Sequence, residues 1–180
     1  MPKLFFIRHG QTETNIQGII AGRIDTVLTQ NGLDDATELG KNLNEHFDYY
    51  YCSPLKRAQQ TMKAIAGDVD YITDERVIEV YPGDWQGKHV SELPKEEDDL
   101  YRKGLYTPPN AETQEEVGER ARSFVDDMFS RYGKDDKILI VTHNAFMRSL
   151  KRLFVTEEFE QPKNLEMFVV DDEMYKPIKI

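Results

Sequence analysis

The sequence has a single cysteine, Cys52, and no apolar run near the ~18 residues that a membrane-spanning helix needs. One cysteine excludes an internal disulfide, which is typical of proteins from a reducing compartment. The apolar stretch at residues 4–7 is too short for a signal peptide, and an arginine follows it directly. These absences predict a cytoplasmic protein that does not bind membranes.

Positive charge is also scarce, with 23 Lys and Arg against 33 Asp and Glu and a formal net charge of −10. Nucleic acids and anionic lipid surfaces bind mainly to basic patches, so neither is expected as a partner. A few clustered arginines can still reverse the sign of the charge locally. The composition is therefore compatible with a small phosphate ester as the partner.

No repeat, linker or low-complexity tract interrupts the 180 residues, so we expect one domain over residues 1–180. Short apolar runs alternate with segments of helical periodicity. Strands are predicted at residues 4–7, 49–52, 69–72, 138–141 and 165–170. Helices are predicted to follow Thr29, to run through residues 55–65, to follow Thr113 and to follow His143. This alternation predicts an α/β fold, a three-layer α/β/α sandwich with a mostly parallel central sheet.

The periodicity fails between about residues 81 and 112, where prolines and glycines are frequent. An acidic run at residues 96–99 is expected to face solvent. Long irregular segments inside compact domains are more often functional than ordinary loops. We therefore expect residues 81–112 to form a flap over a functional site.

Basic side chains follow three of the predicted strands, at the sheet edge where ligands bind in such folds. Arg8 and His9 follow the first strand, Arg57 comes shortly after the second, and His143 follows residues 138–141. Guanidinium groups bind phosphoryl oxygens bidentately, and an imidazole can accept a phosphoryl group covalently. Each residue taken alone also has a structural explanation, as a hydrogen-bonded histidine or a surface arginine. The placement by itself leaves both interpretations open.

Other sites are disfavoured by the motifs that the sequence lacks. No P-loop motif, HExxH motif or paired-cysteine metal spacing is present, and arginines repel divalent cations, so we expect neither a metal nor a cofactor. The spacing between Cys52 and Arg57 does not fit the loop of a cysteine phosphatase. Asp68 and Asp70 do not follow a buried strand, as the aspartate pair of a haloacid-dehalogenase-like phosphatase does.

Five blocks of residues occur in a characteristic order along nearly the whole chain. They are Arg8-His9-Gly10-Gln11-Thr12 with Asn15, Leu28-Thr29 with Gly32, Ser53-Pro54-Leu55 with Arg57-Ala58 and Thr61, Glu79 with Gly83-Asp84-Trp85-Gln86-Gly87, and Val141-Thr142-His143. Together they resemble the histidine phosphatase superfamily, in its phosphoglycerate mutase-like branch.

The resemblance implies that His9 is the nucleophile and forms a phosphohistidine. It places Arg8, Arg57 and His143 around the phosphoryl oxygens, and it makes Glu79 the acid that protonates the leaving oxygen and then activates water. Further hydrogen bonds to the phosphate are implied for Asn15, Gly22 and the backbone at Asn144.

We therefore predict a metal-independent phosphatase for small phosphorylated metabolites. Phosphoglycerate mutase is the alternative, but mutases of this family are usually longer and carry a basic insertion, whereas the flap here is short and acidic. A non-catalytic member that binds a phosphorylated ligand is a third hypothesis, which the intact set with Glu79 disfavours. The sequence leaves the number of subunits open.

Overall fold

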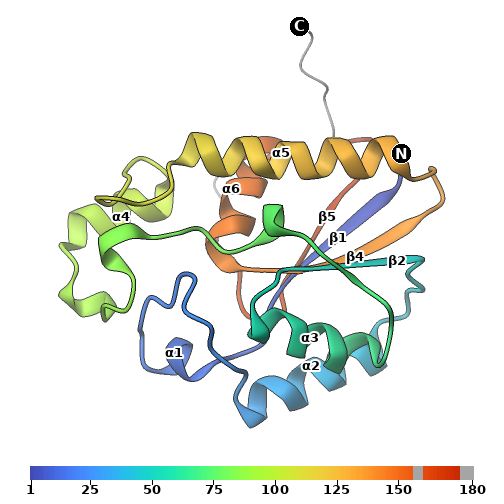
Figure 1. Ribbon diagram of the computed structural model, residues 1–180, viewed down its shortest axis with the longest axis horizontal. Coiled ribbons are helices and arrows are strands. Elements are labelled where there is room, and N and C mark those ends of the chain that lie inside the picture. The colour runs from blue at the N-terminus through green and yellow to red at the C-terminus, as the bar shows by residue number, and fades with distance from the viewer. Residues whose placement is uncertain (156–159, 175–180) are drawn as a thin grey trace, which may run out of the picture.

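The computed structural model describes residues 1–155 and 160–174. Within these residues, five strands form one sheet in the order β3-β2-β4-β1-β5 (Figure 1). Neighbouring strands are parallel except for β5, which is antiparallel to β1. The strands are β1 (Lys3–Arg8), β2 (Tyr49–Cys52), β3 (Ile72–Thr73), β4 (Lys137–Thr142) and β5 (Met167–Val170). The predicted mostly parallel sheet is confirmed.

Helices cover both faces of the sheet, which gives the predicted three layers (Figure 1). On one face lie α5 (Gln114–Arg131) and α6 (Asn144–Phe154), and on the other lie α2 (Gln30–Asn42) and α3 (Lys56–Ala66). Thr29 and Thr113 are the N-caps of α2 and α5, and Thr113 forms a capping box with Glu116. These caps satisfy backbone N–H groups that would otherwise lack partners at the helix starts.

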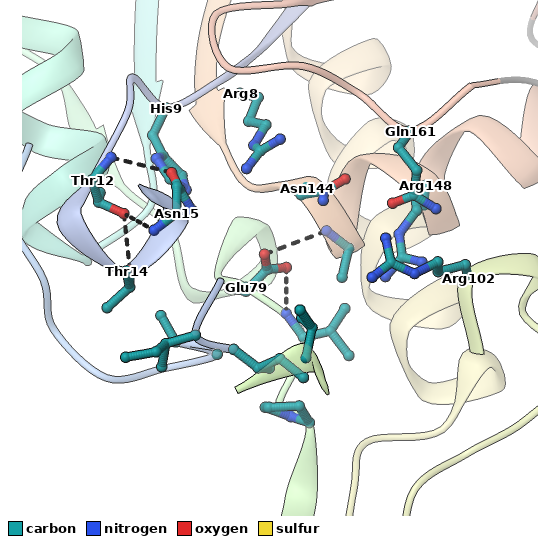
Figure 2. A pocket seen from close by; sticks show the side chains of 18 of the residues that line it. Arg8, His9, Thr12, Thr14, Asn15, Glu79, Arg102, Asn144, Arg148 and Gln161 are labelled. Carbon is teal, nitrogen blue, oxygen red and sulfur yellow. Dashed lines mark hydrogen bonds between the residues drawn. The ribbon is translucent and has the colours of Figure 1, made fainter. Parts of the chain in front are cut away.

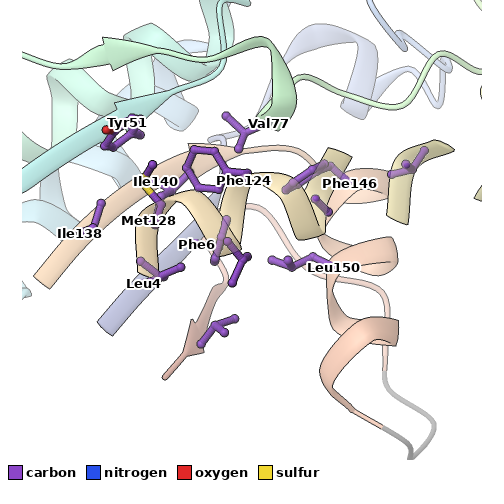
Figure 3. Packing of buried hydrophobic residues seen from close by; sticks show 14 of the residues in the cluster. Leu4, Phe6, Tyr51, Val77, Phe124, Met128, Ile138, Ile140, Phe146 and Leu150 are labelled. Carbon is purple, nitrogen blue, oxygen red and sulfur yellow. The ribbon is translucent and has the colours of Figure 1, made fainter. Parts of the chain in front are cut away.

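The core is divided by the sheet into two clusters, because alternate side chains of a strand point to opposite faces. Along β1, Leu4 and Phe6 belong to the cluster under α5 and α6, whereas Phe5 and Ile7 belong to the cluster under α2 and α3. Figure 3 shows the first cluster, in which Phe6 packs edge-on against Phe124 of α5 with ring centroids 6.1 Å apart. Burying each such side chain contributes ~1.5–3 kcal/mol, which holds the central strands rigidly in place.

The predicted strands at residues 69–72 and 165–170 are partly wrong. β3 consists only of Ile72–Thr73, both exposed, because it lies at the edge of the sheet and pairs only with β2. β5 starts at Met167 because Leu165 has a φ of 62°, a left-handed conformation that a strand does not continue through.

The flap contains a helix that the sequence pattern did not reveal, α4 (Lys95–Lys103). Three side chains of the flap form their own small buried cluster: Trp85, Leu93 and Tyr101. The acidic run starts α4, where negative charge is favoured by the helix dipole. Two members of the run do not face solvent freely, because Glu97 accepts a hydrogen bond from Tyr106 and Asp98 pairs with Arg102. A minor helix, α1 (Glu13–Ile16), follows β1.

Within residues 1–155 and 160–174, no helix has both the length and the apolar character that crossing a membrane requires.

Candidate active site

The carboxyl ends of three parallel strands bring the predicted site residues together. Arg8 is the last residue of β1, and the backbone N–H of His9 donates to the carbonyl of Thr142 at the end of β4 (2.9 Å). On the other side of β4, the N–H of Ser53 donates to Val141 just after β2 ends (3.0 Å). The sheet register alone therefore places His9, Ser53 and the residue after Thr142 side by side.

The His9 imidazole is held in one defined protonation state. Its Nδ1 lies 2.7 Å from the carbonyl oxygen of Gly10, which can only accept, so Nδ1 carries the proton. Nε2 accepts a hydrogen bond from Nε of Arg57 (3.2 Å), so Nε2 has the lone pair. Burial, then the charges of Arg57 and Arg8, hold the pKa of His9 well below its ordinary value. His9 is therefore a neutral imidazole at neutral pH, with an unprotonated Nε2.

Arg57 is fixed by the loop that precedes α2. Its Nη1 and Nη2 donate to the carbonyl oxygens of Ile24 (2.8 Å) and Gly22 (2.6 Å), while its Nε faces His9. Gly22 has a φ of 52°, and a Cβ there would lie 2.4 Å from Cδ of Pro82. Gly22 thus contributes a carbonyl that positions Arg57, in a conformation and a space that only glycine fits.

His143 lies behind His9 rather than on the cavity wall. The two ring centroids are 5.2 Å apart, and Nε2 of His143 is 2.7 Å from Oγ of Ser53. The residue is fully buried, and it is absent from the residues that line the cavity in front of His9. Burial, then Arg57, keep its pKa well below the ordinary value. His143 thus lies beside His9, and its contact with a phosphoryl group stays a prediction.

Glu79 lies at the amino end of α6, held by backbone amides (Figure 2). Its Oε1 accepts from the N–H groups of Val80 (2.8 Å) and Phe146 (3.0 Å), and its Oε2 accepts from Ala145 (3.3 Å). The carbonyl of Glu79 accepts a further bond from Nε of Arg23 (2.9 Å). The orientation of the carboxyl group is therefore fixed. Oε2 accepts one backbone hydrogen bond, whereas Oε1 accepts two.

A cavity of about 170 Å³ opens in front of His9. Of the eight residues predicted for the site, seven line it: Arg8, His9, Asn15, Gly22, Arg57, Glu79 and Asn144. Burial lowers the pKa of Arg8 to about 10, so this group is still a cation at neutral pH. Figure 2 shows the guanidinium of Arg8 pointing into the space between His9 and Glu79. A phosphoryl group in this space would meet an unprotonated imidazole nitrogen, two guanidinium cations and a carboxyl group.

Two supporting residues were not assigned a role from the sequence. Thr61 accepts a hydrogen bond from the N–H of Gly10 (3.0 Å) and donates to the carbonyl of Arg57 (2.7 Å), so it ties the His9 loop to α3. It belongs to the block around Arg57, and its spacing of four residues from Arg57 was the available signal. Asn164 donates to the carbonyl of His9 (2.9 Å) and to Oδ1 of Asn15 (3.2 Å). Asn164 lies 155 residues after His9 in the chain, so no local sequence pattern connects the two residues.

The part of the chain that the structure describes contains no group of three or more His, Cys, Asp or Glu side chains placed to hold a metal ion.

Comparison with known proteins places this geometry in a family. Residues 4–171 match the model of the histidine phosphatase superfamily, branch 1. The chain is 30% identical to phosphoserine phosphatase 1 of Hydrogenobacter thermophilus, over 83% of this chain and 74% of that protein. It is also 30% identical to a 2,3-bisphosphoglycerate-dependent phosphoglycerate mutase of Parvibaculum lavamentivorans, over 83% and 79% of the two chains.

A solved structure agrees with the sequence matches. A mutant of phosphoserine phosphatase from Entamoeba histolytica, crystallised with phosphoserine, superimposes with a TM-score of 0.81 at 29% identity. The match covers 94% of this chain and 90% of that one. The resemblance expected from the five blocks is confirmed: the chain belongs to branch 1 of the histidine phosphatase superfamily.

Proposed function

We propose that this protein is a phosphatase that hydrolyses small phosphomonoesters through a phosphohistidine on His9. The observation that carries the proposal is the state of His9: a neutral imidazole with its proton on Nδ1 and its Nε2 beside a cavity lined by Arg8 and Arg57. Such an arrangement supplies both the nucleophile and the charge stabilisation that phosphoryl transfer requires.

In the first step, Nε2 of His9 attacks phosphorus and the bond between phosphorus and the ester oxygen breaks. The Nδ1 proton stays on the hydrogen bond to Gly10, which spreads the positive charge that develops on the ring. Arg8 and Arg57 stabilise the phosphoryl oxygens, and one such donor is typically worth ~3 kcal/mol. The product of this step is a phosphohistidine and a free alcohol.

The alcohol needs a proton as it leaves, and Glu79, which lines the cavity, is the acid that supplies it in this proposal. We assign the proton to Oε2, because Oε1 already accepts two backbone hydrogen bonds and Oε2 only one. In the second step the ionised carboxylate removes a proton from water, the water oxygen attacks phosphorus, and the N–P bond breaks. Phosphate leaves, and both His9 and Glu79 return to their starting states.

Phosphoglycerate mutase is the second candidate, supported by the mutase among the relatives. A mutase must retain its phosphoenzyme against water, whereas a phosphatase must let water reach it. The flap here contains one α-helix of nine residues, α4, with acidic residues in its first turn, and two 3-10 helices of three residues each, without a basic insertion. This supports hydrolysis. Incubation with 3-phosphoglycerate and 2,3-bisphosphoglycerate decides the question, because isomerisation faster than phosphate release would contradict the phosphatase assignment.

The main test is a trapped phosphoenzyme. Mixing the protein with a labelled phosphate ester and quenching in base should leave about one acid-labile phosphoryl group per chain. His9→Ala should abolish this label and lower kcat by ~10⁴-fold or more, as removal of a nucleophile does in other enzymes. His46→Ala, at an exposed histidine, is the matched control and should behave like the wild type. Full activity of His9→Ala would contradict the mechanism.

Independence from metals and location in the cytoplasm stay predictions. Phosphate release should be the same before and after dialysis against a chelator, since the proposed steps use only protein side chains. Loss of activity that added metal restores would contradict this part of the proposal.

A further inference from the structure

The cavity in front of His9 has a second group of polar side chains at its far end. Arg148 comes from α6, Arg102 from α4, and Gln161 from the segment before β5, and all three line the same cavity as His9. Figure 2 shows them grouped together, on the other side of Asn144 and Glu79 from His9. The mechanism above uses none of the three.

Arg148 is a buried arginine whose hydrogen-bonding groups are only partly used. Only 5% of it is exposed, yet its Nε and Nη1 form no hydrogen bond to any described residue. The ring of Tyr101 lies against it, with 5.0 Å between the guanidinium carbon and the ring centroid. Burial lowers the pKa of Arg148, and Tyr101 and Glu79 only partly oppose this shift. A buried cation of this kind is destabilising unless an anion or acceptors pair with it.

The arginines that line the cavity outnumber the acids, so the cavity has enough positive charge to bind more than one anion. Its lining holds four arginines, Arg8, Arg57, Arg102 and Arg148, against two acids, Glu79 and Asp98. Asp98 is engaged by Arg102 at 2.8 Å, and Glu79 is held by the amides of α6. Arg8 and Arg57 account for the phosphoryl group, and neither of the two acids forms a hydrogen bond or a salt bridge with Arg148.

We propose that the substrate carries a carboxylate, separated from the phosphate by a short chain, and that Arg148 binds it with help from Arg102 and Gln161. The proposal rests on the phosphatase function and adds the substrate class. A guanidinium fork matches the two oxygens of a carboxylate. Arg148 lines the same cavity of about 170 Å³ as His9, and we therefore expect a short chain between the two groups of the substrate.

Pairs of esters that differ at one end test the substrate class directly. 3-Phosphoglycerate differs from glycerol 1-phosphate only by a carboxylate in place of a hydroxymethyl group, and phosphoserine differs from phosphoethanolamine only by the carboxylate. We expect kcat/KM to be ~10- to 100-fold higher for the acid of each pair, the range for a hydrogen-bonded charged group.

Substitutions connect this preference to named residues. Arg148→Met should lower kcat/KM for 3-phosphoglycerate toward the value for glycerol 1-phosphate, mainly by raising KM, and Arg148→Lys should restore part of the preference. Arg102→Met provides a second variant on the surface-facing helix α4 in case the buried substitution prevents folding, and it should reduce the preference ~2- to 5-fold. Arg131→Met, at an arginine paired with Asp127 on α5, is the matched control and should retain the wild-type preference.

Binding to His9→Ala, measured by isothermal titration calorimetry, separates this proposal from the proposed function. A preference for 3-phosphoglycerate over glycerol 1-phosphate in binding supports the carboxylate site, even if the wild-type protein hydrolyses neither ester. Equal affinities, or equal kcat/KM values for both members of each pair, would overturn it. So would Arg148→Met if it lowered kcat/KM for both members by the same factor, because Arg148 would then only support Tyr101.

Discussion

The two ends of the cavity are built in different ways. At the His9 end, the side chains extend from the carboxyl edge of a sheet whose central strands are buried on both faces, and His9, Arg57 and His143 are each at most 3% exposed. At the Arg148 end, part of the wall is the flap, which has a separate cluster of only three buried side chains. The first end is a rigid part of the core, and the second depends on a small appended unit.

This difference separates two tasks. Phosphoryl transfer needs groups held within fractions of an ångström, and the sheet edge with its backbone hydrogen bonds to Arg57 and Glu79 provides that. Recognition of the rest of the substrate needs only a few suitable side chains, and a flap can present these without disturbing the core. We therefore expect changes at the sheet edge to affect kcat and changes in the flap to affect KM.

The largest effect within this scheme is expected from Glu79→Gln, which removes the acid but keeps the size of the side chain. Loss of a general acid typically slows the reaction ~10²–10⁴-fold. The loss should be greatest for alkyl phosphates, whose leaving groups need the proton, and smallest for p-nitrophenyl phosphate. Rates across a series of leaving groups check this, and an equal loss for all of them would show that Glu79 only positions other groups.

Arg57 tests how the sheet edge controls the nucleophile. Arg57→Gln and Arg57→Lys should both lower kcat by ~10²-fold, because neither keeps the bonds to Gly22, Ile24 and His9 together. Only Arg57→Gln removes the charge that lowers the pKa of His9.

The two substitutions should therefore differ in their pH dependence. His9 acts as the neutral form, so activity falls as the pH drops below its pKa. Removing the positive charge raises that pKa, and the acid limb of kcat/KM should move to higher pH in Arg57→Gln but stay close to the wild type in Arg57→Lys. If the acid limb of kcat/KM lay at the same pH in the wild type, Arg57→Gln and Arg57→Lys, this would contradict the electrostatic role of Arg57.

A smaller effect is expected where the flap meets the sheet edge. In Gly22→Ala the new methyl group would meet Pro82 of the flap at 2.4 Å, so the carbonyl that holds Arg57 must move. We expect kcat to fall ~10-fold, since displacements of about 1 Å can cost up to 10²-fold.

Gly67→Ala is the control for backbone strain alone. Gly67 also has a positive φ, 74°, but no atom lies within 4 Å of the added Cβ. This variant should lose ~1–2 kcal/mol of stability and keep its kcat. Equal losses of kcat in both variants would show that strain, rather than the contact with Pro82, causes the effect at Gly22.

The sequence predicted the rigid end well and the flap poorly, and the reason is physical. Residues 4–7, 49–52 and 138–141 are continuous apolar runs because the central strands are buried on both faces, and strand order then determines which side chains meet at the edge. The helix at Lys95–Lys103 has few apolar residues, because it covers a cluster of three side chains rather than a sheet. Amphipathic periodicity could not reveal it.

The same contrast holds within the candidate site. The residues that directly follow strands could be located from the sequence, whereas the position of His143 behind His9 depends on how Ser53 and α6 pack. The sequence did not indicate that Arg148 belongs to the site, since an arginine five residues into a helix is ordinarily a surface residue. Only its burial and its unpaired nitrogens distinguish it.

The smallest expected effect needs no substitution. Trp85 is the single tryptophan and lies in the flap, 5.3 Å from Tyr101 and 5.7 Å from Tyr106 between ring centroids, so its fluorescence reports on the flap alone. Circular dichroism reports on the whole fold. If the flap is a separate weak unit, the fluorescence transition in urea should come slightly before the circular dichroism transition.

Two core substitutions sharpen this measurement. Leu93→Ala removes part of the flap cluster and should move the fluorescence transition while leaving the circular dichroism midpoint nearly unchanged. Phe124→Ala removes a fully buried ring from the cluster under α5 and should lower the free energy of unfolding by ~3–5 kcal/mol, moving both transitions together. Coincident transitions in the wild type and in Leu93→Ala would mean that flap and sheet unfold as one unit, and the division of the cavity into a rigid and an appended end would then have no energetic basis.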